Sequence, residues 1–450
     1  MKLKILSHAG FAVSAAGKTV VCDPWLFGST YWRSWWNYPP PSPELLDSLK
    51  PDCIYITHIH WDHFAGPSLR RFGKDIPIVI PAEPAGRMAR DLKRMSFTRI
   101  IELPHGKTYE VDAALRLTSY QFFVFTDSAV VIEADNTVVL NANDAKLMGG
   151  PLKQILERHP KIDFVLRSHS SANSRACYEV VDSSTTVMPD NREEYIEAFA
   201  DFVRATGARY AIPFASNHCH LHREVFEFND YIVTPVEVAE YFSEQGISKP
   251  ELKVMVSGDS WSDESGFHIQ AQDYFTNRPQ RLREYKEAVS EKLEKTYRRE
   301  ALAQIDLERV KTYFEAVFRS MPFLLRWQFR KNPVLYILGA DKRTTLLEVD
   351  FFRKTVREID SCSDKSHPLQ IRTQVALFNH CMAANLFSHL AISKRVRYRV
   401  TTNTYGLSRK LSFFYNLYEY DLLPLRRIRP VRFVGRYGPG GGERFSCTRE

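Results

Sequence analysis

The feature that most constrains this chain is the string THIHWDHFAG at residues 57–66, which places four metal-binding side chains within six positions. The apolar run DCIYI precedes it and predicts a β-strand that ends where the string begins. His58 and His60 alternate off the strand end, so their imidazoles point the same way, and Asp62 and His63 lie in the following turn. One ion can bind the two alternating histidines and a neighbouring ion Asp62 and His63, whereas a chance polar cluster at a turn has no reason to show this spacing. Imidazole and carboxylate ligands suit Zn, Fe or Mn, so we expect one or two divalent ions here.

The order of the predicted elements indicates an α/β fold with a mixed sheet covered by helices. A strand, a turn and a second strand are predicted within residues 1–25, and strands then alternate with helices as far as TRIIELP. ALRLTSYQFF, SAVVIEA and TVVLNAND predict consecutive strands, and an amphipathic helix is predicted between Asp190 and Gly207. Beyond residue 250 the chain becomes charged and helix-periodic, and later apolar runs predict strands followed by a helix. We therefore expect a catalytic domain at 1–250, a linker at 251–274, a smaller accessory α+β domain at 275–435 and a flexible tail at 436–450.

The motif at residues 57–66 resembles that of the metallo-β-lactamase superfamily. ILSHAGF and VCDPWL resemble the opening hairpin of that family, in the branch that includes the ascorbate-6-phosphate lactonases. DPWLFGSTYWRSWWNYPPPSPELL, followed by DCIYITHIHWDHFAGPSLRRF, resembles the metallo-β-lactamase portion of the CMP-N-acetylneuraminate hydroxylases. The likeness runs over roughly residues 5–225, about half the chain. It implies a metallo-β-lactamase-like αββα sandwich, with the second domain outside the resemblance.

The resemblance also implies further ligands. Asp144, in LNANDAKL after a predicted strand, lies where the family has a metal-bridging aspartate, and an ordinary turn aspartate is the alternative. For the last histidine of the family, IPFASNHCHLH offers three positions, of which His222 fits the hydroxylase-like pattern best and His218 is the next choice. Alternatively, these histidines form a solvated strand end with only one of them bound to metal. In a hydrolase of this kind, Asp62 or Asp144 would orient or deprotonate the metal-activated water.

The clear departure from the family concerns its third-motif histidine, which is expected near residues 120–126. This sequence has YQFFVF there, with Phe123 at the expected place. Substitution by Gln121 or Tyr120 is one explanation, and tight binding of a single metal ion is the other.

Other residues are candidates for bracing the site or binding substrate. In this branch of the family, residues such as His8 and Asp23 line or brace the site, although Asp23 before a proline also suits a turn. The loop RSHSSANSR is rich in small donors that can cradle a phosphate or a sugar, and a plain polar loop is the alternative. The segment 28–43 is rich in Trp and Pro, which predicts an irregular loop whose indoles either stack on a ring or pack the loop itself. The candidate substrate residues are Trp36, Ser168, His169, Asn173 and Arg175.

Charge and cysteine content limit the classes of partner. The formal net charge is +8, which favours an anionic small-molecule substrate, although a mildly basic protein with no special partner is equally compatible. No recognised nucleic-acid motif accompanies the basic runs near the C-terminus, so no nucleic acid is expected. The seven cysteines are scattered and form no C-x-x-C pair, which indicates a reducing compartment. No apolar run approaches the roughly 20 residues of a membrane span, and we expect a cytoplasmic protein.

Two enzymatic functions and one non-enzymatic function fit this sequence. The first is a hydrolase in which a metal-activated water attacks a phosphodiester, a lactone or a nucleotide-sugar-like compound. The second is a di-iron oxygenase, as the resemblance to the hydroxylases implies. A Rieske domain needs a C-x-H and a C-x-x-H motif together, and this sequence does not contain that pair, so an oxygenase would need a separate redox partner. The third is a binding protein with a degenerate site, against which the four clustered ligands argue. We place the hydrolase first.

Overall fold

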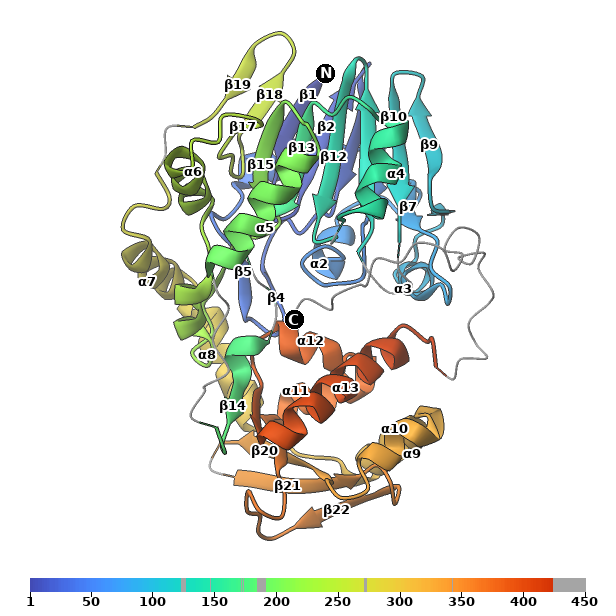
Figure 1. Ribbon diagram of the computed structural model, residues 1–450, viewed down its shortest axis with the longest axis vertical. Coiled ribbons are helices and arrows are strands. Elements are labelled where there is room, and N and C mark those ends of the chain that lie inside the picture. Colours follow the sequence, from blue (N-terminus) through green and yellow to red (C-terminus); the bar gives the residue numbers. More distant parts are fainter. Residues whose placement is uncertain are drawn as a thin grey trace.

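The computed structural model describes residues 1–122, 127–145, 147–170, 172, 174–183, 192–270, 273–341 and 343–423. Figure 1 shows two lobes, with a sandwich of β-sheets and helices above and a smaller α+β lobe below. Phe123, Asn173, Asp190 and the predicted tail at 436–450 lie outside the described residues.

The first sheet of the upper lobe has the strand order β19-β18-β1-β2-β3-β6-β7-β8. β3 pairs in parallel with β6, and β6 with β7, so the carboxyl ends of these strands meet at one edge. β6 leads directly into the histidine-rich string. The strands are β1 (Lys2–Ile5), β2 (Phe11–Ala15), β3 (Lys18–Cys22), β6 (Cys53–Tyr55), β7 (Ile78–Pro81), β8 (Ile100–Leu103), β18 (Ser260–Ser262) and β19 (Gly266–His268).

The second sheet has the order β17-β15-β13-β12-β11-β10-β9. Its β12, β13 and β15 are parallel, and the apolar run of β13 is buried on both faces, as expected for a central parallel strand. The strands are β9 (Lys107–Asp112), β10 (Leu115–Tyr120), β11 (Ala129–Ala134), β12 (Thr137–Asn143), β13 (Phe164–Ser168), β15 (Tyr210–Phe214) and β17 (Glu251–Leu252).

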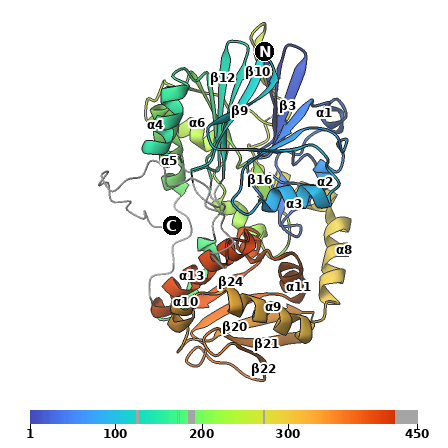
Figure 2. The same ribbon diagram turned by 90° about the vertical axis from the view of Figure 1, so that its right-hand side faces the viewer.

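The two sheets enclose the main core, and helices cover both outer faces (Figure 2). Leu45, Leu69 and Leu92 pack α1, α2 and α3 against the first sheet. Phe199 and Phe242 pack α5 and α6, beside α4, against the second sheet. This arrangement confirms the predicted αββα sandwich. The helices are α1 (Pro43–Asp47), α2 (Gly66–Leu69), α3 (Arg87–Arg94), α4 (Gly150–Arg158), α5 (Arg192–Ala205) and α6 (Pro235–Glu244).

The segment rich in Trp and Pro is more regular than predicted. It contains two short strands that join β16 in a three-stranded sheet of order β16-β5-β4, because the prolines lie beyond the strands rather than within them. Two helices that follow in the chain cover this sheet, since Leu282 and Leu293 contact Trp36 and Leu221 in one buried cluster. The elements are β4 (Ser29–Thr30), β5 (Trp35–Asn37), β16 (His218–His220), α7 (Arg278–Ala288) and α8 (Ser290–Ala301).

The lower lobe is a six-stranded sheet of order β14-β24-β23-β20-β21-β22 with its own hydrophobic core. Its strand β14 comes from the middle of the chain, between β13 and β15 of the upper lobe. The strands are β14 (Tyr178–Val180), β20 (Val334–Ala340), β21 (Arg343–Asp350), β22 (Thr355–Ile359), β23 (Leu369–Gln374) and β24 (Arg397–Val400). The helices are α9 (Leu307–Ser320), α10 (Phe323–Gln328), α11 (Val375–Ala384), α12 (Phe387–Ile392) and α13 (Thr402–Glu419). Two 3-10 helices, η1 (Arg175–Cys177) and η2 (Phe226–Tyr231), come earlier in the chain.

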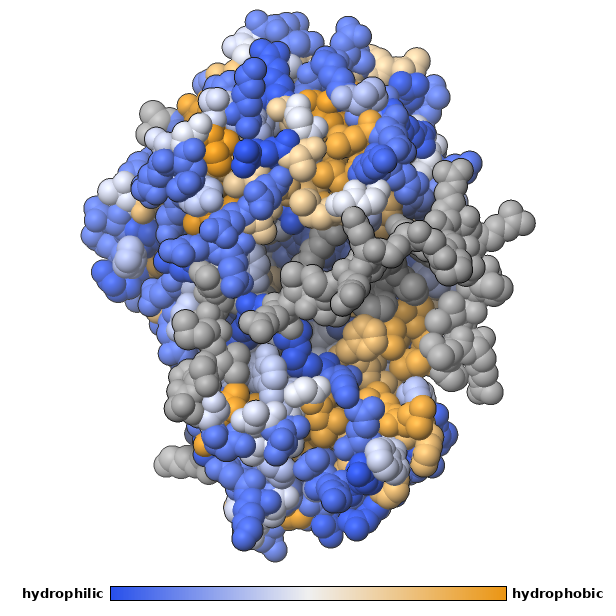
Figure 3. Space-filling view, viewed as in Figure 1, coloured by the Kyte–Doolittle hydropathy of each residue, from blue (hydrophilic) through white to orange (hydrophobic). Residues whose placement is uncertain are grey.

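Residues 251–274, predicted as a linker, instead contribute β17, β18 and β19 to the sheets of the upper lobe. These strands are only two or three residues long, too short for a period-2 pattern to stand out in the sequence. Within the described residues, no helix is long and apolar enough to cross a membrane. Figure 3 shows a mostly hydrophilic surface, with apolar area at the front of the upper lobe and at the right of the lower lobe. In the lower lobe, α10 exposes Phe323, Leu324 and Trp327.

Candidate metal centre

The adjacent ends of β3 and β6 place Asp23 beside the histidine-rich string. The Asp23 carboxylate accepts hydrogen bonds from the backbone N–H of Thr57 at 2.8 Å and from its hydroxyl at 2.7 Å. Asp23 Oδ2 also lies 2.8 Å from His63 Nδ1. Asp23 is fully buried, so this carboxylate determines the orientation of the His63 ring and directs Nε2 away from the strand.

The cluster contains three overlapping groups of three side chains each. Within each group, the ligand atoms of the three side chains lie within 4.8 Å of one another. Because His58 and His63 each belong to two groups, the groups form adjoining positions rather than separate sites. The predicted ligands His58, His60, Asp62, His63 and Asp144 are therefore brought together. The groups are His8, Asp62 and His63; His58, His63 and Asp144; and His58, His60 and Asp127.

Asp62 is held by groups from two other segments. His8 Nε2 lies 3.1 Å from Asp62 Oδ2, and the Tyr31 hydroxyl donates a 2.5 Å hydrogen bond to Asp62 Oδ1. Tyr31, Trp32 and Arg33 all have positive φ, a backbone conformation that is costly for residues other than glycine. Such backbone conformations persist where the surrounding structure requires them, and here the turn delivers the Tyr31 hydroxyl to Asp62.

The electrostatics of the cluster favour a cation. Burial disfavours a charged His63, but the carboxylates of Asp62, Asp23 and Asp144 outweigh burial and raise its pKa well above the usual range. Burial and the neighbouring imidazoles lower the pKa of His58 and of His60 to about 4, so both are neutral near pH 7. Neutral imidazoles and ionised carboxylates are the forms that bind metal.

The donor set fits a divalent metal ion. His63 Nε2 is buried without a hydrogen-bond partner, although it lies 3.3 Å from both Asp62 Oδ2 and Asp144 Oδ2. A buried imidazole nitrogen facing two carboxylate oxygens is satisfied when all three bind one ion. His58 Nε2 lies 2.9 Å from His60 Nδ1 and 3.4 Å from Asp127 Oδ1, a second mixed donor group.

Asp127 was missed by sequence reasoning. It lies four positions after Phe123, where the family histidine is absent, and its carboxylate joins His58 and His60. The hydroxyl of Tyr120, one of the two predicted substitutes, instead lies 2.9 Å from His159 Nε2. The backbone of Gln121, the other one, bonds His105 Nδ1 through its carbonyl at 2.8 Å and its N–H at 3.1 Å. The only signal in the sequence was a carboxylate shortly after the missing histidine.

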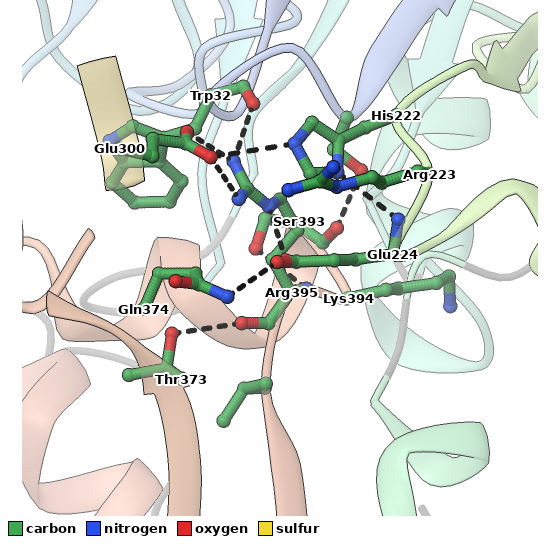
Figure 4. Close-up of polar contacts among 12 residues, drawn as sticks. Trp32, His222, Arg223, Glu224, Glu300, Thr373, Gln374, Ser393, Lys394 and Arg395 are labelled. Carbon is green, nitrogen blue, oxygen red and sulfur yellow. Dashed lines mark hydrogen bonds and ion pairs between the residues drawn. The ribbon is translucent and has the colours of Figure 1, made fainter. Parts of the chain in front are cut away.

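Two of the three late histidines, His218 and His222, were predicted as ligands, and they lie in different surroundings. His218 stacks on Trp35, with ring centroids 3.7 Å apart, and its ring lies 5.3 Å from that of His8. His218 Nε2 is buried without a partner, next to the Asp62 side of the cluster. His222, the first choice from sequence, instead points its Nε2 at Glu300, 3.6 Å away (Figure 4). Neither histidine belongs to the three ligand groups within the described residues, and His218 lies beside them.

Within the described residues, His169 is in none of the three ligand groups, and the other predicted substrate residues lie in varied surroundings. Trp36 is 2% exposed, packs under α7 and α8, and donates its indole N–H to the Arg33 carbonyl. His169 is fully buried, and burial above all lowers its pKa to about 3. Arg175 faces Glu194 at 3.6 Å, Ser168 ends β13, and Asn173 lies outside the described residues.

The lower lobe covers one side of the cluster. His389, on α12, is 1% exposed, and its ring lies 5.6 Å from that of His60 and 5.1 Å from that of Trp61. Tyr31, which holds Asp62, stacks on Trp61 at 5.8 Å and lies at the same distance from His389. The second lobe is therefore part of the wall of the metal centre.

We expect Asp23→Asn to weaken metal binding by about 10- to 100-fold, because the amide no longer holds His63 as the charged carboxylate does. Competition between the protein and a chromophoric chelator for Zn(II) measures this change. Asp52→Asn is the matched control, since Asp52 binds Lys18 at the surface of the same sheet. Equal zinc affinity in wild type and Asp23→Asn would contradict the role of Asp23.

A second expectation concerns Glu419, at the end of α13, which is 3% exposed and bonds Ser388 beside His389. Burial, opposed by hydrogen bonds from Ser388, raises the pKa of Glu419 to about 8. The folded state then binds this proton more tightly than the unfolded state, so the stabilisation is complete below about pH 4.5 and is lost as pH rises through 8. Between about pH 4.5 and pH 8, urea unfolding should show that the free energy of unfolding of wild type falls by on the order of a few kcal/mol relative to that of Glu419→Gln. The exposed Glu358→Gln should follow wild type, and parallel pH profiles of wild type and Glu419→Gln would refute the assignment.

Residues 2–122 match the family model described as Beta-lactamase superfamily domain. The chain is 26% identical over 271 residues to a protein of Mycolicibacterium smegmatis named as a Rieske 2Fe-2S iron-sulfur protein, covering 56% of this chain and 50% of that protein. It is 31% identical over 157 residues to cytidine monophosphate-N-acetylneuraminic acid hydroxylase of Mus musculus, covering 33% of this chain and 27% of that protein. The chain spans about half, or less, of the length of these relatives, and the homology is distant.

Solved structures align with the upper lobe. An isothiocyanate hydrolase from Delia radicum gut bacteria covers 58% of this chain and 99% of its own, with a TM-score of 0.43 and 17% identity. CmlA, a diiron β-hydroxylase from Streptomyces venezuelae, covers 58% of this chain and 53% of its own, with a TM-score of 0.40 and 17% identity.

Proposed function

Since the N-terminal part of this chain is a domain of the metallo-β-lactamase superfamily with a clustered His/Asp metal site, we propose that the protein is a metal-dependent hydrolase. Its substrate in this proposal is an anionic small molecule with a phosphodiester, lactone or nucleotide-sugar-like group. Divalent ions bound at such a site lower the pKa of water and polarise a phosphoryl or carbonyl oxygen.

The observation that carries the proposal is the overlap of the ligand groups. His58 and His63 are shared between groups, and Asp144 lies in the middle group with both of them. Asp62 and His63 are buried, whereas Asp144 and Asp127 are partly exposed. A site that is closed on one side and open on the other suits catalysis better than a structural ion would, because substrate can reach the open positions.

The two predicted catalytic aspartates have different surroundings, which supports different roles. Both Asp62 oxygens are occupied by His8 and Tyr31, so Asp62 serves as a fixed ligand. Asp144 faces His63 and is partly exposed, so it is the better placed of the two to accept a proton from the attacking water. Of the late histidines, His218 is the better choice for a further ligand, because its ring lies 5.3 Å from that of His8, whereas His222 Nε2 faces Glu300 at 3.6 Å.

The anionic substrate is proposed from charge. The chain carries a net charge of +8, and a positive surface potential raises the local concentration of anions. Neutralisation of the four carboxylates Asp23, Asp62, Asp127 and Asp144 by bound metal is needed before an anion can approach the cluster.

Elemental analysis and the visible spectrum of aerobically purified protein test the proposal. We expect one or two zinc or manganese ions per chain, no visible band, and hydrolysis of bis(p-nitrophenyl) phosphate or of a simple lactone. A protein that binds no metal even after reconstitution would refute any metalloenzyme function. Metal binding without hydrolysis of either class of compound would refute the hydrolase.

The second candidate is a di-iron oxygenase, and the sequence relatives favour it. The relative from Mus musculus is named as a hydroxylase, and the mycobacterial relative is named for a Rieske centre. This chain does not contain the paired C-x-H and C-x-x-H motifs, so the oxygenase would take electrons from a separate redox partner. About two irons per chain with a visible band that bleaches on reduction would favour this candidate over the hydrolase.

A further inference from the structure

We propose that His389, carried by α12 of the lower lobe, is a substrate-contacting residue of the metal centre. In this proposal its Nε2 forms a hydrogen bond with an oxyanion group of the phosphate type held at the His58, His60 and Asp127 side. The inference rests on the proposed function, because it requires a site loaded with metal.

The first support is a buried nitrogen without a partner. His389 is 1% exposed, and its Nε2 has no hydrogen-bond partner, whereas its Nδ1 lies 3.3 Å from Ser388 Oγ. A buried polar atom without a partner costs stability, on the order of 1–3 kcal/mol, and is retained when something else binds it. The neighbouring rings place this side chain beside the candidate metal centre, because the His389 ring lies 5.6 Å from that of His60 and 5.1 Å from that of Trp61.

The second support is that contacts from both lobes determine the position of α12. At its end, the Trp35 indole N–H donates to the Ile392 carbonyl at 3.1 Å, and the Ser34 hydroxyl donates to the Ser393 carbonyl at 2.6 Å. At its start, Ser388 donates its backbone N–H at 2.6 Å to Glu419, and its hydroxyl also bonds that carboxylate. A side chain held in this way needs little reorganisation to bind a ligand.

Figure 4 shows the ion-pair network that follows α12 directly. The Arg395 guanidinium binds both oxygens of Glu300, at 2.8 and 2.7 Å, and one oxygen of Glu224 at 2.9 Å. It also donates to the Trp32 carbonyl at 2.9 Å, next to Tyr31 of the metal centre. The network bonds the chain just after α12 to the turn at Tyr31, which holds Asp62. The lower-lobe side and the upper-lobe side of the site are therefore connected.

A phosphate-type group suits both sides of this space. Metal held by His58, His60 and Asp127 would take oxygen atoms of the group, and His389 would bond another atom of it. An inorganic phosphate ion carries acceptor oxygens and, as the monoanion, hydroxyl groups, so it pairs with either tautomer of the imidazole. A hydrogen bond between a neutral side chain and a charged group contributes enough to change affinity about tenfold.

The test uses the full chain loaded with Co(II) and inorganic phosphate as the probe. Phosphate titrations followed in the visible spectrum should give a dissociation constant about tenfold higher for His389→Ala than for wild type. The Co(II) content and the phosphate-free spectrum should stay unchanged. His389→Gln, which places an amide near the position of Nε2, should recover part of the affinity.

His367→Ala is the matched control for loss of a buried histidine in the same lobe. Both His367 nitrogens are occupied, by Ser366 at 2.9 Å and Glu348 at 2.8 Å, so this variant should lose stability but keep the phosphate affinity of wild type. Equal phosphate affinity in His389→Ala and wild type would overturn the proposal. A changed Co(II) content or phosphate-free spectrum in His389→Ala would also overturn it, since His389 would then be a metal ligand.

The failures of the two proposals are distinguishable. If wild type does not bind Co(II), the proposed function fails and this inference fails with it. If wild type binds Co(II) but phosphate does not perturb its spectrum, the inference about His389 alone is refuted.

Discussion

Replacing His58 and His60 together by alanine should abolish one metal position and lower the hydrolysis rate by about a thousandfold or more. His58 belongs to two of the three ligand groups and His60 to one, so the double change removes donors from both adjoining positions. Metal activation of water supplies several kcal/mol of barrier lowering, and each 1.4 kcal/mol corresponds to about tenfold in rate. Metal content and the rate of hydrolysis of bis(p-nitrophenyl) phosphate measure the two effects.

The control for this double variant is His268→Ala, an exposed histidine on β19, which should keep full metal content and rate. The fold of the double variant should persist, because the core between the two sheets does not include either histidine. A folded double variant that retains wild-type hydrolysis would exclude the histidine-rich string as the catalytic centre. Retention of metal with loss of rate would indicate that the remaining groups bind an ion in an unproductive position.

Replacing Arg395 by methionine should lower the free energy of unfolding by about 3–5 kcal/mol. The Arg395 side chain is fully buried between Glu300 and Glu224, with Glu300 8% exposed. The methionine fills part of the space but leaves two carboxylates without their counter-ion in a low-dielectric environment, which is the costly case for a buried ion pair. Urea unfolding followed by circular dichroism measures the change.

Arg399→Met is the matched control, since Arg399 pairs with Asp364 and Glu179 at the surface of the same lobe, and exposed pairs contribute about 0–1 kcal/mol. Adding Glu300→Gln to Arg395→Met should recover part of the loss, because it removes one stranded charge. An equal, small effect of Arg395→Met and Arg399→Met would show that the buried network contributes little to stability.

The stabilisation by the same ion-pair network depends on pH. Burial disfavours the Glu300 carboxylate, but hydrogen bonds from Arg395 and the nearby His222 ring outweigh burial and lower its pKa to about 2. The unfolded chain then binds this proton at a higher pH than the folded chain does, so the stabilisation is complete above about pH 5 and is lost as pH falls toward 2. Glu300→Gln should remove this contribution to the acid sensitivity.

The sequence by itself determined the metal motif and the sandwich that holds it. A strand end followed by a tight turn is local structure, so the alternation of His58 and His60 and the position of Asp62 and His63 follow from a few neighbouring residues. Asp144 was predicted from the resemblance to the superfamily instead, and it follows directly on β12. Alternating and continuous apolar runs likewise determined which strands are buried, since burial on one or both faces is written into the residue pattern.

Only the tertiary structure decided which distant groups join the cluster. Asp127 stands in a stretch without a recognisable pattern, and it meets His58 and His60 because β11 lies in the opposite sheet at the same edge of the sandwich. The sequence favoured His222 over His218, yet His222 faces Glu300 and His218 lies next to His8. His389 lies more than 300 residues beyond the motif, and only the packing of the lower lobe on Tyr31 and Trp61 brings it there. Contacts between segments far apart in the chain depend on how whole sheets and lobes pack, and no local periodicity encodes that packing.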